Sequence, residues 1–210
     1  MAALLSDATQ RSPSVRPARE EDAGAVVPLL YASAGGMYDR YAGGSRRALR
    51  LLERAYTARG TNASSEVIAV AEIDGRVAAA MAAFTTDEIA ARASAFLRLT
   101  LRSVPPWRVP AALRLYWAGM RAAPSPPRSA LYVDALATTS EHRRRGAAGA
   151  LLTEAERVAK ELDMPAVALD TALDNKPARA LYLGRGYEEV AYRPPGRRLP
   201  GFVALVKPLA

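Results

Sequence analysis

A basic loop that precedes a predicted helix is the part of the sequence best suited to chemistry. Three arginines stand before a glycine and two alanines: Arg143, Arg144, Arg145, Gly146, Ala147 and Ala148. A helix start presents unpaired N–H groups and the positive end of the helix dipole, so it can bind phosphate. Arginine adds charge and donors, and glycine permits close approach of a ligand. The alternative, a merely solvated basic turn, is disfavoured because positive charge there opposes the dipole.

The composition excludes several other kinds of site. The chain has no cysteine, which rules out disulfides, cysteine zinc sites and an acyl-cysteine intermediate. His142 is its only histidine, so neither a histidine metal cluster nor a Ser/His/Asp triad with a spare histidine is expected. We therefore predict no metal site.

The net charge of +8 suits an anionic ligand, and by itself it would equally suit a nucleic acid. A genome rich in G and C would also explain the many alanines, arginines and prolines. A nucleic-acid-binding module is the weaker alternative, because aromatics do not interleave with the arginines and no helix-turn-helix or zinc spacing is visible.

Hydrophobic patterning predicts the elements that position the basic loop. With 210 residues, half of them hydrophobic, we expect one domain over residues 14–210, preceded by a disordered tail at 1–13. In the N-terminal half the patterns predict a short strand at 15–17, a helix that ends at Gly35-Gly36, a helix at 45–59, and a hairpin that turns at Asp74-Gly75 between 67–72 and 77–84.

Residues 85–129 differ from their surroundings. Two helical patterns, at about 87–101 and 110–121, flank Pro105-Pro106, and the segment is too short for a core of its own. We interpret it as a helical insertion. After it, the patterns predict a strand at 131–138, the basic loop, a helix at 146–162, a strand at 167–170, a helix at 175–183, and strands starting at Tyr187 and at Phe202.

Two signatures in this C-terminal half resemble those of the GNAT superfamily of N-acetyltransferases. The basic loop is similar to the family's pyrophosphate loop, Gln/Arg-x-x-Gly-x-Gly/Ala. A second signature follows in the right order: Asn175, Ala178, Leu181, Tyr182, Gly186 and Tyr187. The resemblance covers about residues 130–190. The long connection at 85–129 departs from the family pattern.

The resemblance implies an α/β (α+β) fold, in which helices flank a mixed, mostly antiparallel central sheet and the helical insertion precedes the cofactor-binding strand. Acetyl-coenzyme A (acetyl-CoA), the expected co-substrate, would enter between the strands at 131–138 and 167–170. The residues implied to bind it are Leu136, Ala137, Thr138, Arg143, Arg144, Arg145, Gly146, Ala147, Ala148 and Asn175. Asn175 could instead be an ordinary helix cap.

The implied reaction is direct transfer of the acetyl group to a primary amine. Tyr182 stands where the family often keeps the acid that protonates the leaving thiolate, although it could simply pack between helix and sheet. Asp134, the only carboxylate on its strand, could accept the amine proton or pair with a neighbouring arginine. The resemblance also leaves open a GNAT-like protein that binds coenzyme A without catalysis.

The expected partner is a small-molecule amine, with no nucleic acid and no membrane. No stretch is apolar enough to span a bilayer, and Met1–Leu5 does not start a secretory signal, so we predict a cytoplasmic protein. The insertion leads into the strand at 131–138 on the side where the acetyl group should lie. We expect it to wall or cover the acceptor pocket, with a homodimer contact through it as an additional hypothesis. The alternative is a helical pair that packs on the sheet away from the chemistry.

Overall fold

The computed structural model describes residues 12–122, 124–196 and 200–209. Most of the expected tail at 1–13 therefore lies outside the described residues. Seven strands form one sheet within the described part: β1 (Ser14–Pro17), β2 (Ile68–Ile73), β3 (Arg76–Thr85), β4 (Ala130–Thr138), β5 (Ala166–Ala172), β6 (Glu188–Arg193) and β7 (Phe202–Pro208).

The strand order is β1-β2-β3-β4-β5-β7-β6. Of the six pairings, β4–β5 is parallel and the other five are antiparallel. The mixed, mostly antiparallel sheet that we predicted is thus confirmed. The Asp74-Gly75 hairpin is present between β2 and β3, with both turn residues at positive φ.

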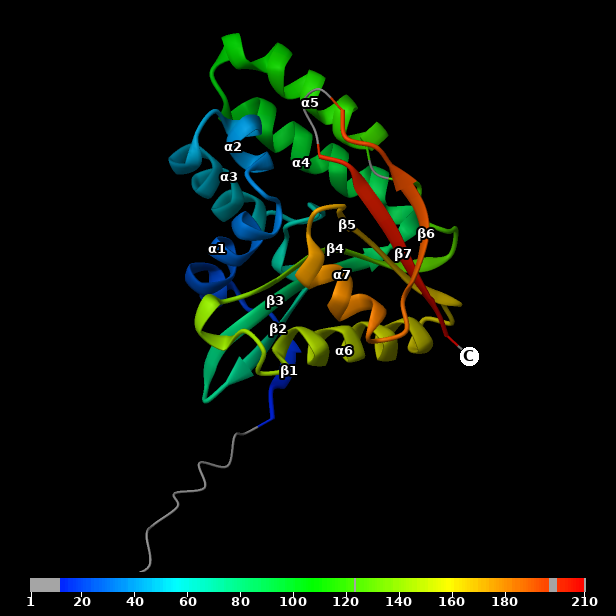
Figure 1. Ribbon diagram of the computed structural model, residues 1–210. Coiled ribbons are helices and arrows are strands. Elements are labelled where there is room, and N and C mark those ends of the chain that lie inside the picture. Colours follow the sequence, from blue (N-terminus) through cyan, green and yellow to red (C-terminus); the bar gives the residue numbers. More distant parts are fainter. Residues whose placement is uncertain (1–11, 123, 197–199, 210) are drawn as a thin grey trace, which may run out of the picture.

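Helices cover both faces of the sheet (Figure 1). They are α1 (Ala23–Ser33), α2 (Met37–Ala42), α3 (Ser45–Thr57), α4 (Ile89–Ser103), α5 (Val109–Ala122), α6 (Ala147–Glu161) and α7 (Lys176–Leu183). Leu151 and Leu152 of α6 are fully buried in one core, with Val167 of β5. Leu52 of α3 and Val26 of α1 belong to a second core on the opposite face.

The two helices expected within 85–129 correspond to α4 and α5. Figure 1 shows α5 on the outside of α4, at the end of the molecule away from α6. Phe96 of α4 packs against Tyr38 and Tyr41, with ring centroids 5.8 and 6.5 Å apart. Both tyrosines lie on α2, a helix of six residues that our sequence analysis missed.

The parallel pairing of β4 with β5 is short. It runs from Ala130 opposite Ala166 to Val133 opposite Leu169. Within the described residues, β4 and β5 form no further pairing after this point. The two strands therefore diverge, as expected, immediately after these residues. At the same point β4 contains a bulge, because Ala82 and Ala83 of β3 face Ala135 and Val133 and leave Asp134 without a partner on β3.

An ion-pair network ties β1 to β2 and to the start of α1. The Arg16 guanidinium donates two hydrogen bonds to Asp22, at 2.7 and 2.9 Å, and also binds Glu72 at 2.7 Å. Asp22 is only 8% exposed. The Arg16 side chain, with the help of the Arg19 N–H, lowers the pKa of Asp22.

We expect Arg16→Leu to lower the free energy of unfolding by about 2 kcal/mol at pH 7, because it leaves a covered carboxylate short of donors. The pKa of Asp22 is lower in the folded state than in the unfolded state. The stability that Asp22 gains from Arg16 is therefore present above about pH 4, and it disappears as the pH falls through the folded-state pKa. Urea unfolding of the wild type and the variant at pH 7 and at pH 3 measures the loss of stability and its dependence on pH. Arg157→Leu, which breaks an exposed network on α6, should matter far less; equal losses would contradict this account.

Candidate active site

A cleft of about 610 Å³ opens where β4 and β5 diverge. Nine of the ten residues predicted to bind the cofactor line it, together with Tyr182. Its lining comes from α1, the end of β4, the basic loop, the first turn of α6, and α7: Ala32, Ser33, Leu136, Ala137, Thr138, His142, Arg143, Arg144, Gly146, Ala147, Ala148, Gly149, Asn175, Pro177, Ala178, Leu181 and Tyr182.

The basic loop has the backbone conformation of an anion site. Gly146 is the N-cap of α6 with φ +83°, a value that side chains rarely allow. Arg144 also has positive φ, and the side chains of Arg143 and Arg144 are exposed at the cleft. The first N–H groups of α6 have no partner within the helix, so they are available to an anion in the cleft.

Arg145 does not fit the predicted role, because its side chain points away from the cleft. Its guanidinium pairs with Asp74 of the β2–β3 turn at 3.2 Å. The positive φ of Arg144 turns the backbone at that residue, so the side chain of Arg145 leaves the loop in a different direction from those of Arg143 and Arg144. Arg145 therefore links the loop to the hairpin.

Asn175 has the cap role that we considered as an alternative. Its side-chain oxygen accepts a hydrogen bond from the Ala178 N–H at 3.4 Å, and its amide donates to Thr171 Oγ1 at 3.1 Å. The residue still lines the cleft. A contact with the cofactor stays a prediction, while the cap accounts for the orientation of α7.

Leu136, Ala137 and Thr138 present one edge of their backbone to the cleft. On the other edge they pair with Met81, Ala80 and Ala79 of β3. On the side of β5 no strand pairs with them in the described chain, since that pairing ends at Val133. Backbone groups are therefore exposed along this edge, as extended binding of a ligand arm would require.

Asp134 occupies the bulge at the point where β4 leaves β5. Its Oδ2 accepts a hydrogen bond from Asn62 Nδ2 at 3.0 Å. The residue is exposed to solvent, yet the protein packed around its carboxyl group removes much of the hydration of that group. This desolvation, followed by the charge of Asp170, raises the pKa of Asp134 to about 7, against the opposing effect of Asn62.

Asp170 is a second carboxylate at the same point, which our sequence analysis placed on a strand but did not assign to the site. It follows the last paired residue of β5 as Asp134 follows that of β4. The Tyr132 hydroxyl donates a short hydrogen bond to it. Burial raises the pKa of Asp170, and this effect outweighs the hydrogen bond from Tyr132, which acts to lower the pKa. The parallel register brings the two aspartates, 36 residues apart, to one end of the paired segment.

Tyr182 lies on α7 and is 6% exposed, with its ring 6.0 Å from that of Tyr187. Burial and then the charge of Asp170 raise the pKa of Tyr182 to about 12. The phenol is therefore protonated throughout the neutral range. Packing and access to the cleft coexist at this residue, because its ring is in the core and it also lines the cleft.

Comparison with known proteins identifies the family. The profile of the acetyltransferase (GNAT) family matches residues 39–187, most of the chain. The chain belongs to the GNAT family. A search of curated proteins finds no match.

Solved structures of acetyltransferases share the fold. An N-acetyltransferase from Staphylococcus aureus Mu50 superposes with a TM-score of 0.70 at 19% identity, over 92% of this chain and 99% of that one. Histone acetyltransferase HPA2 and related acetyltransferase from Corynebacterium glutamicum ATCC 13032 gives 0.62 at 22% identity, over 95% and 98%. The chain is thus a GNAT acyltransferase, a member of a family that uses acetyl-CoA.

Our sequence analysis did not assign several residues around Asp134 to the site, because short or distant elements bring them there. Burial, and then the charge of Asp134, raise the pKa of Tyr38 on α2. Asn62 comes from the loop before β2, and Tyr132 precedes the bulge. An α2 flanked by Gly35-Gly36 and Gly43-Gly44 is too short to show helical periodicity, so the sequence carries no signal for Tyr38.

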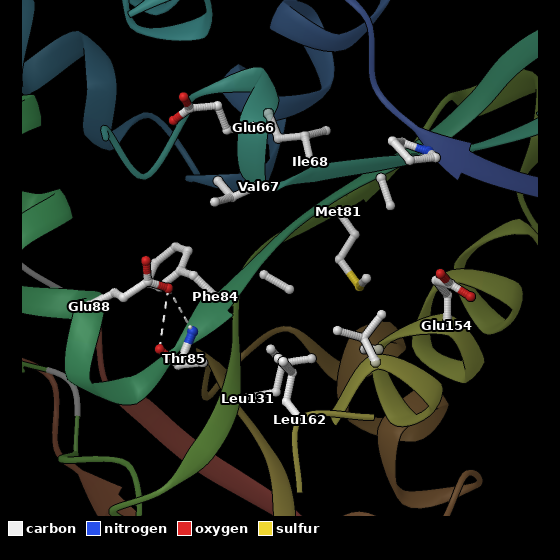
Figure 2. Close-up of a pocket in the computed structure, with 15 residues that line it drawn as sticks. Glu66, Val67, Ile68, Met81, Phe84, Thr85, Glu88, Leu131, Glu154 and Leu162 are labelled. Carbon is white, nitrogen blue, oxygen red and sulfur yellow. Dashed lines mark hydrogen bonds between the residues drawn. The ribbon is translucent and has the colours of Figure 1, made fainter. Parts of the chain in front are cut away.

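A second depression, of about 300 Å³, lies between the sheet and the C-terminal half of α6, and none of the predicted site residues lines it (Figure 2). Met81 and Leu131 point into it, while Glu66, Glu88 and Glu154 stand around it. Each of these carboxylates is paired with an arginine outside the depression. It therefore offers no free charge for chemistry.

Within the residues that the structure describes, no helix is both long enough and apolar enough to cross a membrane. The same residues contain no group of three or more His, Cys, Asp or Glu side chains arranged for a metal ion. The cytoplasmic location stays a prediction.

Proposed function

We propose that this protein transfers the acetyl group of acetyl-CoA directly to the primary amine of a small molecule. One observation carries the proposal. A single cleft is lined by an anion-binding loop, an unpaired strand edge and the phenol of Tyr182. Asp134 does not line this cleft, but it lies on the same strand, two residues before the lining residue Leu136. These are the groups that binding a pyrophosphate and moving two protons would need.

In the proposed reaction, the amine nitrogen attacks the thioester carbonyl carbon. A carbon–nitrogen bond forms and the carbon–sulfur bond breaks. Asp134 accepts the proton that the amine loses, directly or through water, and Tyr182 donates a proton to the departing thiolate. A backbone N–H near Leu136 would stabilise the oxyanion. Because the pKa of Asp134 is about 7, it can act as a base near neutral pH.

We also propose that α2 and the insertion form the wall of the acceptor site. Tyr38 lies near Asp134, and Phe96 of α4 packs on its ring. The Tyr116 hydroxyl lies 3.4 Å from Ser94 Oγ of α4. Its neighbour Trp117, which belongs to the same insertion, is 55% exposed. Geometry therefore supports Tyr116 and not Trp117 as a wall residue.

Two substitutions test the cofactor placement. Gly146→Val puts a branched side chain where the backbone has φ +83° and should abolish measurable acetyl-CoA binding. Arg143→Ala should weaken binding by about 1–3 kcal/mol through loss of a charge-assisted contact. Isothermal titration calorimetry measures both.

Arg145→Ala is the matched control, since it removes an arginine from the same loop that faces Asp74. We expect its affinity for acetyl-CoA to stay close to that of the wild type. Unchanged affinity in Gly146→Val and Arg143→Ala, or a larger loss in Arg145→Ala, would overturn the placement of the pyrophosphate.

A further inference from the structure

The positive charge of the chain is concentrated in the segment that contains α4 and α5. Residues 89–133 hold seven arginines and no acidic residue. The whole chain has 29 basic and 21 acidic residues, so the remainder holds 22 basic and 21 acidic residues and is nearly neutral. A compositional bias towards arginine in the whole chain would not produce this separation.

Most of these arginines keep their charge available. Among the described residues, Arg92 is the member of this segment that forms an ion pair, with Glu88 at 2.8 Å. Arg98, Arg102, Arg114 and Arg121 are exposed. Arg114 donates only to the Pro110 carbonyl of its own helix in the described contacts, so its charge is not neutralised.

Exposed apolar side chains accompany these charges. Trp107, in the turn between α4 and α5, is 78% exposed, and Trp117 and Met120 of α5 are 55% and 45% exposed. Arg114, Trp117 and Arg121 are spaced three and four residues apart, so they share one face of the helix. The Arg121 guanidinium lies 5.9 Å from the centre of the Trp117 ring.

A shallow depression of about 430 Å³ lies on this face. Leu113, Arg114, Trp117, Ala118 and Arg121 line it. Arg114 and Arg121 lie on either side of Trp117 along the helix. The two arginines provide hydrogen-bond donors for an anionic group, and the tryptophan ring provides an apolar surface beside them. We call the set Trp107, Arg114, Trp117, Met120 and Arg121 the α5 surface.

We propose that the α5 surface binds the protein peripherally to a membrane that contains anionic phospholipids. Tryptophan and methionine would enter the interface between headgroups and acyl chains, while the arginines contact lipid phosphates. This partner accounts for the charge and for the exposed apolar side chains together. Two copies of the surface would repel each other, so it is poorly suited to a symmetric homodimer. The earlier expectation of no membrane partner considered spanning segments only.

Co-sedimentation with vesicles tests the proposal. The full chain should bind vesicles of phosphatidylcholine mixed with phosphatidylglycerol, and should bind vesicles of phosphatidylcholine alone far more weakly. Arg114→Glu with Arg121→Glu should reduce binding to the anionic vesicles about 30-fold or more, from roughly 1 kcal/mol for each arginine lost. Trp107→Ala with Trp117→Ala should also reduce it, and Trp117 fluorescence in the Trp107→Phe variant should shift to the blue when anionic vesicles are added.

Arg76→Glu with Lys160→Glu makes the same change in net charge at exposed positions elsewhere. Binding of this control should be reduced much less than that of the α5 variant, with circular dichroism showing that both are folded. Equal losses would show a non-specific charge effect and overturn the proposal. So would absence of binding to anionic vesicles, tighter binding to duplex DNA or single-stranded RNA, or a wild-type dimer that the tryptophan substitutions convert to a monomer.

Discussion

Replacing Asp134 by Asn should lower kcat by about 10²–10⁴-fold while acetyl-CoA still binds, because the variant cannot accept the proton of the attacking amine. Asn is nearly isosteric with Asp and can still pair with Asn62, so the bulge of β4 should persist. Steady-state kinetics with an accepted amine, together with calorimetry of acetyl-CoA, separates the loss of chemistry from a loss of binding.

The pH profile makes this prediction more specific. A base with a pKa of about 7 is protonated at low pH, so kcat/KM should fall as the pH falls through about 7. Asp170→Asn removes a negative charge that raises the pKa of Asp134. It should therefore move the acid limb of the profile, where kcat/KM falls, to lower pH. Asn62→Ala removes a donor that lowers the pKa of Asp134, and should move the limb to higher pH.

The acceptor amine also titrates, but its own pKa is the same with every variant. Opposite shifts of the limb in Asp170→Asn and Asn62→Ala would therefore belong to Asp134. If the limb stays in place in both variants, the group that titrates is not Asp134, and its assignment as the base is wrong.

Replacing Tyr182 by Phe should lower kcat by about 10²-fold or more, with little change in the affinity for acetyl-CoA. The substitution removes only the hydroxyl and keeps the ring that packs against Tyr187. Because the pKa of Tyr182 is about 12, the wild-type enzyme should show no loss of activity from its ionisation between pH 7 and about pH 10.

Tyr187→Phe is the matched control, because its ring packs against that of Tyr182. Its hydroxyl is buried and has no partner in the described structure, and the residue is 2% exposed. We expect its turnover to match the wild type. If Tyr182→Phe stays within a factor of about two of the wild type, Tyr182 is only a packing residue.

The parts of the site that could be predicted from sequence are those that local signals specify. A glycine before a helical pattern fixes the helix start, and Gly146 has the positive φ that such a cap uses. Asp74-Gly75 likewise identifies the β2–β3 turn. Asn175 three residues before Ala178 marks the cap of α7. Each of these features depends on residues that are close in the chain.

The parts that could not be predicted depend on register and on the rotation of helices. Asp170 joins Asp134 only because β4 and β5 pair in one particular parallel register. Tyr116 and Trp117 are neighbours of similar character, and only the packing of α5 on α4 determines which one faces inward. Arg145 lies in a row of three arginines, and the backbone turn at Arg144 directs it towards Asp74.

The most direct test of the proposed function is mass spectrometry of a reaction that contains the wild-type protein, acetyl-CoA labelled in its acetyl group, and a panel of primary amines. Direct transfer predicts free coenzyme A and labelled N-acetyl product in equal amounts, formed only when an accepted amine is present, with no acetyl group on the protein. Release of coenzyme A that does not depend on any amine, or labelled acetyl groups that accumulate on the protein, would contradict the account.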